Sequence, residues 1–175
     1  SPRGQTPRPH PSEPDMTLDE INRGPRSQVR RALLACADVP RWADAICDGR
    51  PYPDEAALVD RADRLAREIT DDELARALAA HPRIGDRARG GSTEAAWSRQ
   101  EQAGVMPDAE LVEVNQAYEE RFSRVFLVCA TGLTTGDVVA AARARLANDD
   151  ATETAVVKDE LRKIAVVRLQ KELDG

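Results

Sequence analysis

The sequence predicts an all-α fold, a single compact domain of about eight helices. Ala, Leu, Arg and Glu dominate the composition, and all four are strong helix formers. Apolar residues recur with the 3.6-residue period of a helix, and no stretch alternates apolar and polar residues for long. Aromatic residues make up only 3% of the 175 residues, so we expect a core of small aliphatic side chains.

The first fifteen residues predict a disordered, proline-rich tail. They hold five of the eleven prolines and almost no apolar side chain, so they cannot bury enough surface to become ordered. The all-α domain is expected to comprise residues 16–175. Its first helix begins near Thr17, because Thr17-Leu18-Asp19-Glu20 has the form of a capping box.

Helical stripes follow one another through the next fifty residues. Val29 begins an apolar stripe that continues at positions 33, 34 and 37. Pro40 suits the first turn of a short second helix, which Gly49 and the prolines that follow it bring to an end. A third stripe runs from Ala57 to Ala66.

The middle of the chain predicts three more helices. Thr70-Asp71-Asp72-Glu73 is a second capping box, and the helix that it opens is expected to run to His81, where Pro82 stops it. Further helices are expected over 93–104 and 108–122.

The remaining segments are a loop, an apolar run and two closing helices. Residues 85–92 are rich in glycine, but they lack the spacing of a phosphate-binding loop and no clear strand precedes them, so they predict a surface loop. The apolar run 125–130 is either a strand or irregular. Helices are expected near 135–147 and 151–173.

Charge and cysteine content exclude several classes of protein. The net charge of −6 disfavours a general nucleic-acid binder or a protein that binds anionic membranes. No apolar run approaches the ~20 residues of a membrane span. The three cysteines are widely spaced and no Cys/His cluster has zinc-ligand spacing, so we expect free, buried thiols, no metal and a cytoplasmic protein.

His81 is the first candidate for chemistry. Leu74, Ala77, Leu78 and His81 have the spacing of one helical face, which should look inward. A histidine at a helix C-terminus titrates near neutral pH, and the helix dipole favours its charged form, which suits a general acid or base. The alternative is a histidine that only caps the helix.

Three polar residues share one face of the helix expected over 93–104. Ser98, Glu101 and Gln102 supply a hydroxyl, a carboxylate and an amide at helical spacing. Together they could hold a flat heterocycle with many N–H and C=O groups. The alternative is an ordinary solvated face.

Arg168 lies on the apolar stripe of the last helix, with Ile164 and Leu169. An arginine that faces a core needs an anionic partner, because an unpaired buried charge is costly. That partner is either a protein carboxylate such as Glu101 or a carboxylate of the substrate. A third possibility is that the side chain extends past the core to solvent.

Taken together, these motifs resemble one family. The segments HPRIG at 81–85 and WSRQEQAG at 97–104 resemble the signature of the OHCU decarboxylase family, where OHCU is 2-oxo-4-hydroxy-4-carboxy-5-ureidoimidazoline. The likeness continues in NQAYE at 115–119 and spans about 17–173. It departs from the family at Ser123-Arg124, which replaces a pair that contains glycine.

The resemblance implies a family-type OHCU decarboxylase fold and a carboxy-lyase that needs no cofactor. It implies decarboxylation of OHCU to (S)-allantoin in urate degradation, a small ureide as substrate, and a homodimer. It implies catalytic roles for His81, Glu101 and Arg168. The residues implied to bind substrate are Pro82, Ser98, Gln102, Phe126, Leu127, Val128, Cys129 and Ala130, the last five largely through their main chain.

Two other functions stay open at this point. One is a cofactor-free lyase or hydrolase that acts on another ureide ring in the same pocket. The other is an inactive helical binding module, which would need an exposed apolar groove.

Overall fold

The computed structural model describes residues 16–85 and 93–174. The predicted tail and most of the glycine-rich loop lie outside these ranges. The described residues form the following helices: α1 (Leu18–Arg23), α2 (Arg26–Cys36), α3 (Pro40–Asp48), α4 (Glu55–Ala66), α5 (Asp71–Ala79), α6 (Thr93–Glu101), α7 (Ala109–Phe122), α8 (Thr135–Arg145) and α9 (Asp150–Asp174). They contain no strand, so the predicted all-α fold is confirmed.

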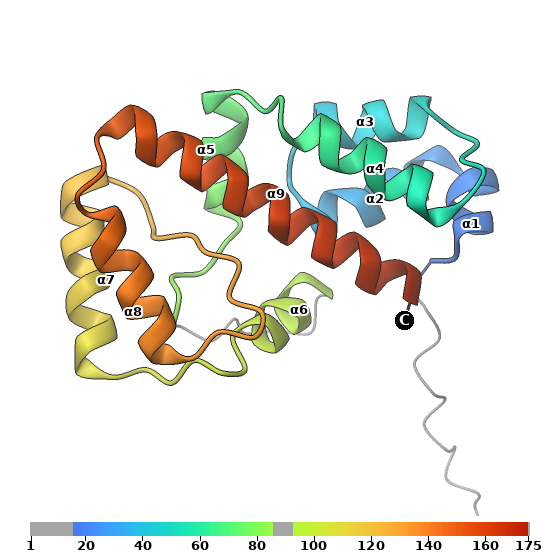
Figure 1. Ribbon diagram of the computed structural model, residues 1–175. Coiled ribbons are helices and arrows are strands. Elements are labelled where there is room, and N and C mark those ends of the chain that lie inside the picture. The colour runs from blue at the N-terminus through green and yellow to red at the C-terminus, as the bar shows by residue number, and fades with distance from the viewer. Residues whose placement is uncertain (1–15, 86–92, 175) are drawn as a thin grey trace, which may run out of the picture.

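The long helix α9 crosses the whole molecule and joins its two ends (Figure 1). Its C-terminal half packs against α2 and α4, and α3 packs on both of these. Helices α7 and α8 pack together at the other end, beside the N-terminal half of α9. Helix α5 lies between the two groups, and α6 lies against α2.

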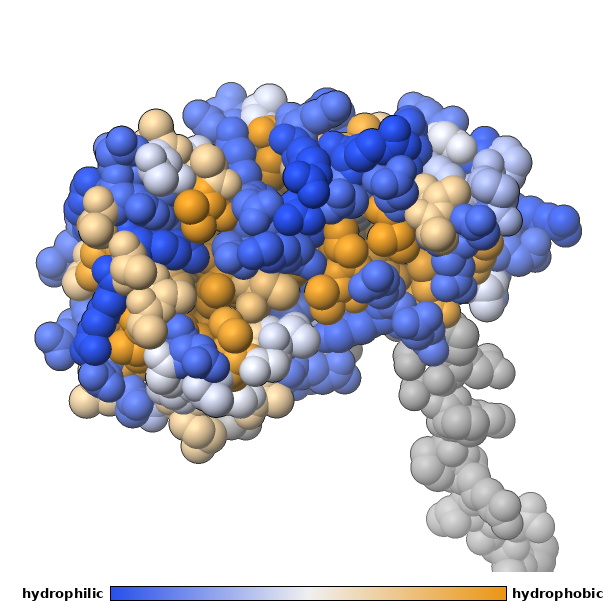
Figure 2. Space-filling model, viewed as in Figure 1, coloured by the Kyte–Doolittle hydropathy of each residue, from blue (hydrophilic) through white to orange (hydrophobic). Residues whose placement is uncertain are grey.

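Two hydrophobic clusters correspond to these two ends. The larger cluster centres on Trp42, Leu58 and Leu161 and takes residues from α1 to α5 and from α9. The smaller one centres on Tyr118 and Phe126, with aliphatic residues of α7 and α8 around them. On the face shown in Figure 2, hydrophilic side chains predominate, and apolar ones gather along the flank of α9.

Helix starts follow the capping residues that the sequence presents. Thr70 and Glu73 form the complete capping box, with both reciprocal hydrogen bonds. Thr17 accepts from the Glu20 N–H. Thr134 and Asp137 form a further capping box, at a helix start that the sequence analysis placed without identifying its cap.

Two helical boundaries differ from the sequence prediction. Helix α5 ends at Ala79, so His81 lies just beyond the helix, although its N–H still bonds to the Leu78 carbonyl. Helix α6 ends at Glu101 rather than near residue 104. The segment 125–130 is irregular, one of the two alternatives left open for it.

Ser123 ends α7 in the left-handed conformation, with φ 57°. Glycine adopts this conformation without the steric cost that a Cβ brings. Ser123 therefore carries local backbone strain at this helix end, within the Ser123-Arg124 pair that departs from the family resemblance.

None of the helices in the described ranges has the length and apolar character required to span a bilayer.

Candidate active site

A small hollow with a cavity volume of about 20 Å³ lies between α6, α9, the residues after α5 and the irregular segment. The described residues that line it are His81, Pro82, Ile84, Ser98, Glu101, Gln102, Phe126, Leu127, Val128, Ala130 and Ile164. Nine of these were singled out by the sequence analysis. They come from three separate stretches of the chain, which only the fold brings together.

His81 is half-buried at the wall of the hollow, and its imidazole is uncharged at neutral pH. Burial, and secondly the positive charge of Arg168, lower its pKa to about 4. From the sequence, His81 is predicted to titrate near neutral pH, with its charged form favoured by the helix C-terminus. That expectation is wrong, because His81 lies past the helix end and desolvation outweighs the helix dipole. A neutral imidazole in a hollow can accept a proton.

The segment that follows His81 is held at three successive residues. Arg83 makes a two-pronged ion pair with Glu119 at 2.6 and 2.9 Å. The Ile84 carbonyl accepts from the Asn115 amide at 2.9 Å, and the Gly85 N–H donates to Gln102 Oε1 at 2.9 Å.

Gly85 has φ +93°, and a Cβ there would lie 2.8 Å from Leu111 Cδ2. This position therefore requires glycine, which explains the last residue of the HPRIG segment.

Glu101 and Arg168 form a buried ion pair at the base of the hollow. Arg168 Nε lies 2.8 Å from Glu101 Oε1, and Nη2 lies 3.2 Å from Oε2. Each side chain is less than 10% exposed. The guanidinium also donates to the Ala35 carbonyl and lies over the Trp97 ring. Two anionic partners were considered for Arg168, a protein carboxylate and a carboxylate of the substrate. The structure shows the first of these, Glu101.

Glu101 lines the hollow, and Arg168 is not among the described residues that do so. Arg168 therefore binds Glu101 without itself lining the hollow. Ser98 is also buried in the wall, at 4% exposed. The alternative of a solvated face for Ser98 and Glu101 is therefore excluded.

Gln102 is anchored through one end of its amide. Its Oε1 accepts the Gly85 N–H, so its Nε2 is the end available as a donor. Because Gln102 also lines the hollow, the side chain both holds the segment after His81 and offers a donor beside it.

The irregular segment 125–130 closes one side of the hollow. Its main chain is held by side chains instead of by a helix or sheet. Arg145 Nη1 donates to the Leu127 carbonyl at 2.6 Å, and the Cys129 N–H donates to Glu160 Oε2 at 3.0 Å. Cys129 does not line the hollow, and burial raises the pKa of its thiol. The segment therefore offers mainly backbone and apolar groups to the hollow.

The sequence analysis missed the residues that hold this segment. Arg145 is paired with Glu153, which is fully buried and also accepts from Tyr118 and Asn148. A signal was present, because Glu153, Glu160 and Arg168 have spacings of seven and eight residues and so lie on one face of a helix. A charged residue on the inner face of α9 needs a partner, and each of these three has one at the site or next to it.

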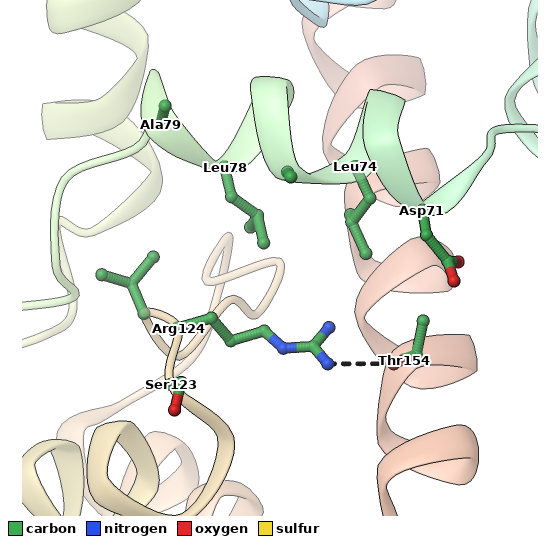
Figure 3. Close-up of a pocket in the computed structure, with 9 residues that line it drawn as sticks. Asp71, Leu74, Leu78, Ala79, Ser123, Arg124 and Thr154 are labelled. Atoms are coloured by element: carbon green, nitrogen blue, oxygen red, sulfur yellow. Dashed lines mark hydrogen bonds between the residues drawn. The ribbon is translucent and has the colours of Figure 1, made fainter.

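A larger hollow with a cavity volume of about 500 Å³ lies between α5, α9 and residues 123–125. Figure 3 shows Leu74 and Leu78 pointing into it from α5, and the Arg124 guanidinium reaching Thr154. Its charged groups are already engaged, since Asp71 pairs with Lys158 and this pairing lowers the pKa of Asp71. It holds no imidazole and no buried carboxylate, so the smaller hollow is the better candidate for chemistry.

Within the described ranges, no group of three or more His, Cys, Asp or Glu side chains is arranged to bind a metal ion. The three cysteines all lie within the described ranges and form no disulfide; two of them are buried and Cys129 is partly exposed.

Comparison with known proteins adds three findings. The family model described as OHCU decarboxylase matches residues 22–170. The uric acid degradation bifunctional protein of Bacillus sp. (strain TB-90) is 24% identical over 162 residues, which cover 89% of this chain and 32% of that protein. The 2-oxo-4-hydroxy-4-carboxy-5-ureidoimidazoline decarboxylase of Haloferax volcanii is 25% identical over 163 residues, which cover 89% of this chain and 95% of that protein.

The fold also has a match among solved structures. A crystal structure of OHCU decarboxylase in the presence of (S)-allantoin superposes with a TM-score of 0.67 at 20% identity, covering 87% of this chain and 100% of the other. This chain thus spans about a third of the Bacillus relative and nearly all of the Haloferax one.

Proposed function

Because the chain belongs to the OHCU decarboxylase family, we propose that it decarboxylates OHCU to (S)-allantoin in urate degradation. The observation that carries this proposal is the small hollow, where the neutral imidazole of His81 shares a wall with the Glu101 carboxylate and the polar groups of Ser98 and Gln102. The names of the Bacillus and Haloferax relatives support the same reaction.

The chemistry of the substrate explains why protein side chains can be sufficient for this decarboxylation without a cofactor. The carboxylate is attached to a ring carbon next to a C=N bond. When carbon dioxide leaves, the electron pair of the broken C–C bond moves into this C=N group, and its nitrogen takes up a proton from solvent. The substrate therefore has its own electron sink, and we propose that no cofactor takes part.

We assign proton transfer to His81. The neutral imidazole takes the proton of the substrate hydroxyl, whose oxygen becomes a carbonyl, and returns a proton to the ring carbon that bears the ureido group. Delivery from one side of the ring sets the (S) configuration. The low pKa of His81 supports this role, because the imidazole is ready to accept a proton at neutral pH.

The other polar groups orient the ring. Glu101 keeps lone pairs available beside its bonds to Arg168 and can accept from the hydroxyl or from ring N–H groups. Gln102 Nε2 and Ser98 Oγ can donate to the ureido and ring oxygens. Pro82 and residues 126–130 would contact the ring. We propose that Arg168 acts through Glu101, which it holds in place.

We further propose a homodimer in the cytoplasm. The family resemblance supports the dimer, and three cysteines that form no disulfide support a reducing compartment. Light scattering after gel filtration at micromolar concentration tests the dimer. A mass of one chain, 19.2 kDa, would contradict it.

An assay with substrate made in place tests the reaction. Urate oxidase and hydroxyisourate hydrolase generate OHCU from urate, and circular dichroism follows the appearance of (S)-allantoin. We expect rapid formation with the wild-type protein and at least a hundredfold loss in His81→Asn. His10→Asn is the matched control, because it makes the same change in the only other histidine.

Two results would redirect the assignment. Near-normal turnover by His81→Asn would remove proton transfer from His81. No acceleration by the wild type would favour either another ureide ring, to be tested with related ureides, or an inactive binding module. The larger hollow with Leu74 and Leu78 is the feature that a binding module would use.

A further inference from the structure

In the irregular segment 125–130 the N–H groups of Phe126, Leu127, Val128 and Ala130 have no acceptor among the described residues, and all four residues line the hollow. The Val128 N–H differs from the other three because the carbonyl of its own peptide, that of Leu127, accepts from Arg145, and the next N–H along the chain, that of Cys129, donates to Glu160. Leu127 and Val128 both line the hollow. An unpaired main-chain donor at a buried wall is costly unless a ligand or water meets it.

Arg145 sets the direction of this N–H. Its Nη1 holds the Leu127 carbonyl at 2.6 Å. A trans peptide is planar, so its N–H points to the side opposite its C=O. Because the Leu127 carbonyl turns towards Arg145, the N–H of Val128 turns away from it.

Arg145 is itself held rigidly. Its Nε and Nη2 lie 2.8 and 2.5 Å from Glu153 Oε1, and its guanidinium lies 4.5 Å from the centre of the Phe126 ring. Glu153 is fully buried. Burial alone would raise its pKa, but the hydrogen bonds from Arg145, Tyr118 and Asn148 outweigh burial and lower it. This carboxylate stays charged and keeps the arginine in one position.

Glu160 holds the next peptide along the chain, between Val128 and Cys129. Its Oε2 accepts the Cys129 N–H at 3.0 Å, and its Oε1 pairs with Lys163 on the solvent side. Glu160, Ile164 and Arg168 are spaced four residues apart on α9, so they share one face. Ile164 lines the hollow and Arg168 holds Glu101. One face of α9 thus supports two walls of the hollow.

A buried ion pair such as Arg145–Glu153 often contributes no more to stability than well-packed apolar residues would. Its value here is geometric, since an irregular segment has no ladder of backbone bonds to fix its peptides. We propose that Arg145 and Glu160 are positioning residues that hold the Val128 N–H as a donor to the substrate. This inference rests on the proposed function, because the donor would meet an oxygen of the ring or of the ureido group.

Two variants of Glu160 separate geometry from charge. Glu160→Gln removes the charge but keeps an acceptor at the same reach, and Glu160→Asp keeps the charge but is one methylene shorter. With OHCU generated in place, we expect Glu160→Gln to stay within about threefold of wild-type kcat. We expect Glu160→Asp to lose at least tenfold, since small displacements of positioning groups cost large factors in rate. Lys163→Ala, which removes the solvent-side ion pairs of Lys163 with Glu160 and Asp159, should leave kcat unchanged.

Exchange of the Cys129 amide proton, followed by NMR, gives a readout that does not depend on activity. If the Cys129 amide proton stays protected from exchange in Glu160→Gln and loses protection in Glu160→Asp, the proposed positioning role of Glu160 is supported. If wild type and Glu160→Asp have equal kcat, or if their Cys129 amide protons exchange equally fast, the proposed role of Glu160 is overturned. A larger loss of kcat in Glu160→Gln than in Glu160→Asp would also overturn the proposal, because the charge of the side chain and not its length would then matter.

The proposed function can fail separately. Wild-type protein that does not accelerate OHCU decay would overturn the reaction, and with it the role of the Val128 donor in that reaction. The exchange experiment would still decide whether Glu160 holds the peptide.

Discussion

Arg168 and Glu101 are 67 residues apart in the chain, yet they form a two-pronged ion pair in the wall of the candidate site. The pair has two consequences. It places a carboxylate in the hollow with its charge compensated, and it leaves a positive group near His81 that helps to keep the imidazole neutral. The interior face of α9 and the polar face of α6 are therefore matched to each other.

Removing one partner of this pair should cost both stability and activity. Arg168→Met leaves Glu101 buried without its counter-charge, and we expect the free energy of unfolding to fall by about 3–5 kcal/mol. Arg168→Lys keeps a positive charge but cannot make two parallel hydrogen bonds to Glu101. We therefore expect at least a tenfold fall in kcat/KM, with a smaller loss of stability than in Arg168→Met. Urea denaturation and the allantoin assay measure the two effects.

Arg143→Met is the matched control for Arg168→Met. Arg143 pairs with Glu110 in solvent, and we expect its loss to change stability by no more than about 0.5 kcal/mol. Equal effects of the two substitutions would contradict the special weight given to the buried pair.

The pH dependence of activity should show no histidine step near neutral pH. Because the pKa of His81 is lowered to about 4, the imidazole is neutral from pH 8 down to about pH 5. We expect kcat/KM, corrected for spontaneous decay of OHCU, to be level over this range as far as His81 is concerned. A fall centred near pH 6.5 would show that the free enzyme carries an ordinary histidine.

The same pKa predicts how His81 affects stability. Between pH 6.5 and 4 the unfolded chain binds a proton at this histidine that the folded chain does not bind, so stability falls as the pH falls through this window. Above pH 6.5 the contribution is constant. Carboxylates also contribute in acid, so the quantity to measure is the difference in unfolding free energy between wild type and His81→Asn. A difference that does not vary between pH 7 and 4.5 would contradict the prediction.

Ser123→Gly should stabilise the protein. Ser123 ends α7 with φ 57°, where glycine has no Cβ to strain, and we expect a gain of about 1 kcal/mol. Ala140→Gly, at an exposed position inside α8, should instead cost about 1 kcal/mol. Thermal denaturation of both variants decides the matter, and a loss of stability in Ser123→Gly would contradict the strain.

The hydrogen bond donated by the Tyr118 hydroxyl should contribute more to the free energy of unfolding than the one donated by the Tyr52 hydroxyl. Tyr118 donates to the charged Glu153 at 2.5 Å, whereas Tyr52 donates to the neutral Ile46 carbonyl at 2.6 Å. We expect Tyr118→Phe to cost about 1.5–3 kcal/mol and Tyr52→Phe about 1 kcal/mol. If the two losses are equal in urea denaturation, the buried charge of Glu153 does not strengthen the bond.

Much of the fold was predictable, because helix periods and caps are local properties. The helix starts at Thr70 and Asp108 follow from side chains that cap the next turn, and the inward direction of Arg168 follows from its apolar neighbours on one stripe. The end of α5 was placed two residues late, because the boundary depends on where the chain must turn to reach α7.

The candidate site was predictable only as a set of residues. Motif resemblance selected His81, Glu101 and the segment 126–130, and the fold brings all of them except Cys129 to one hollow, although their roles stay predictions. The neutral state of His81 could not be read from the helix end, because desolvation depends on all the elements packed around it.

The sequence alone determined where most helices lie and named nine of the eleven described residues that line the hollow, since both depend on residue identity and short spacings. The tertiary structure decided which groups are paired. It joined Arg168 to Glu101, and it placed Arg145 on the Leu127 carbonyl and Glu160 on the Cys129 N–H. These pairings connect residues far apart in the chain, and a buried charge or an irregular peptide takes whichever partner the packing of whole helices brings within hydrogen-bond distance.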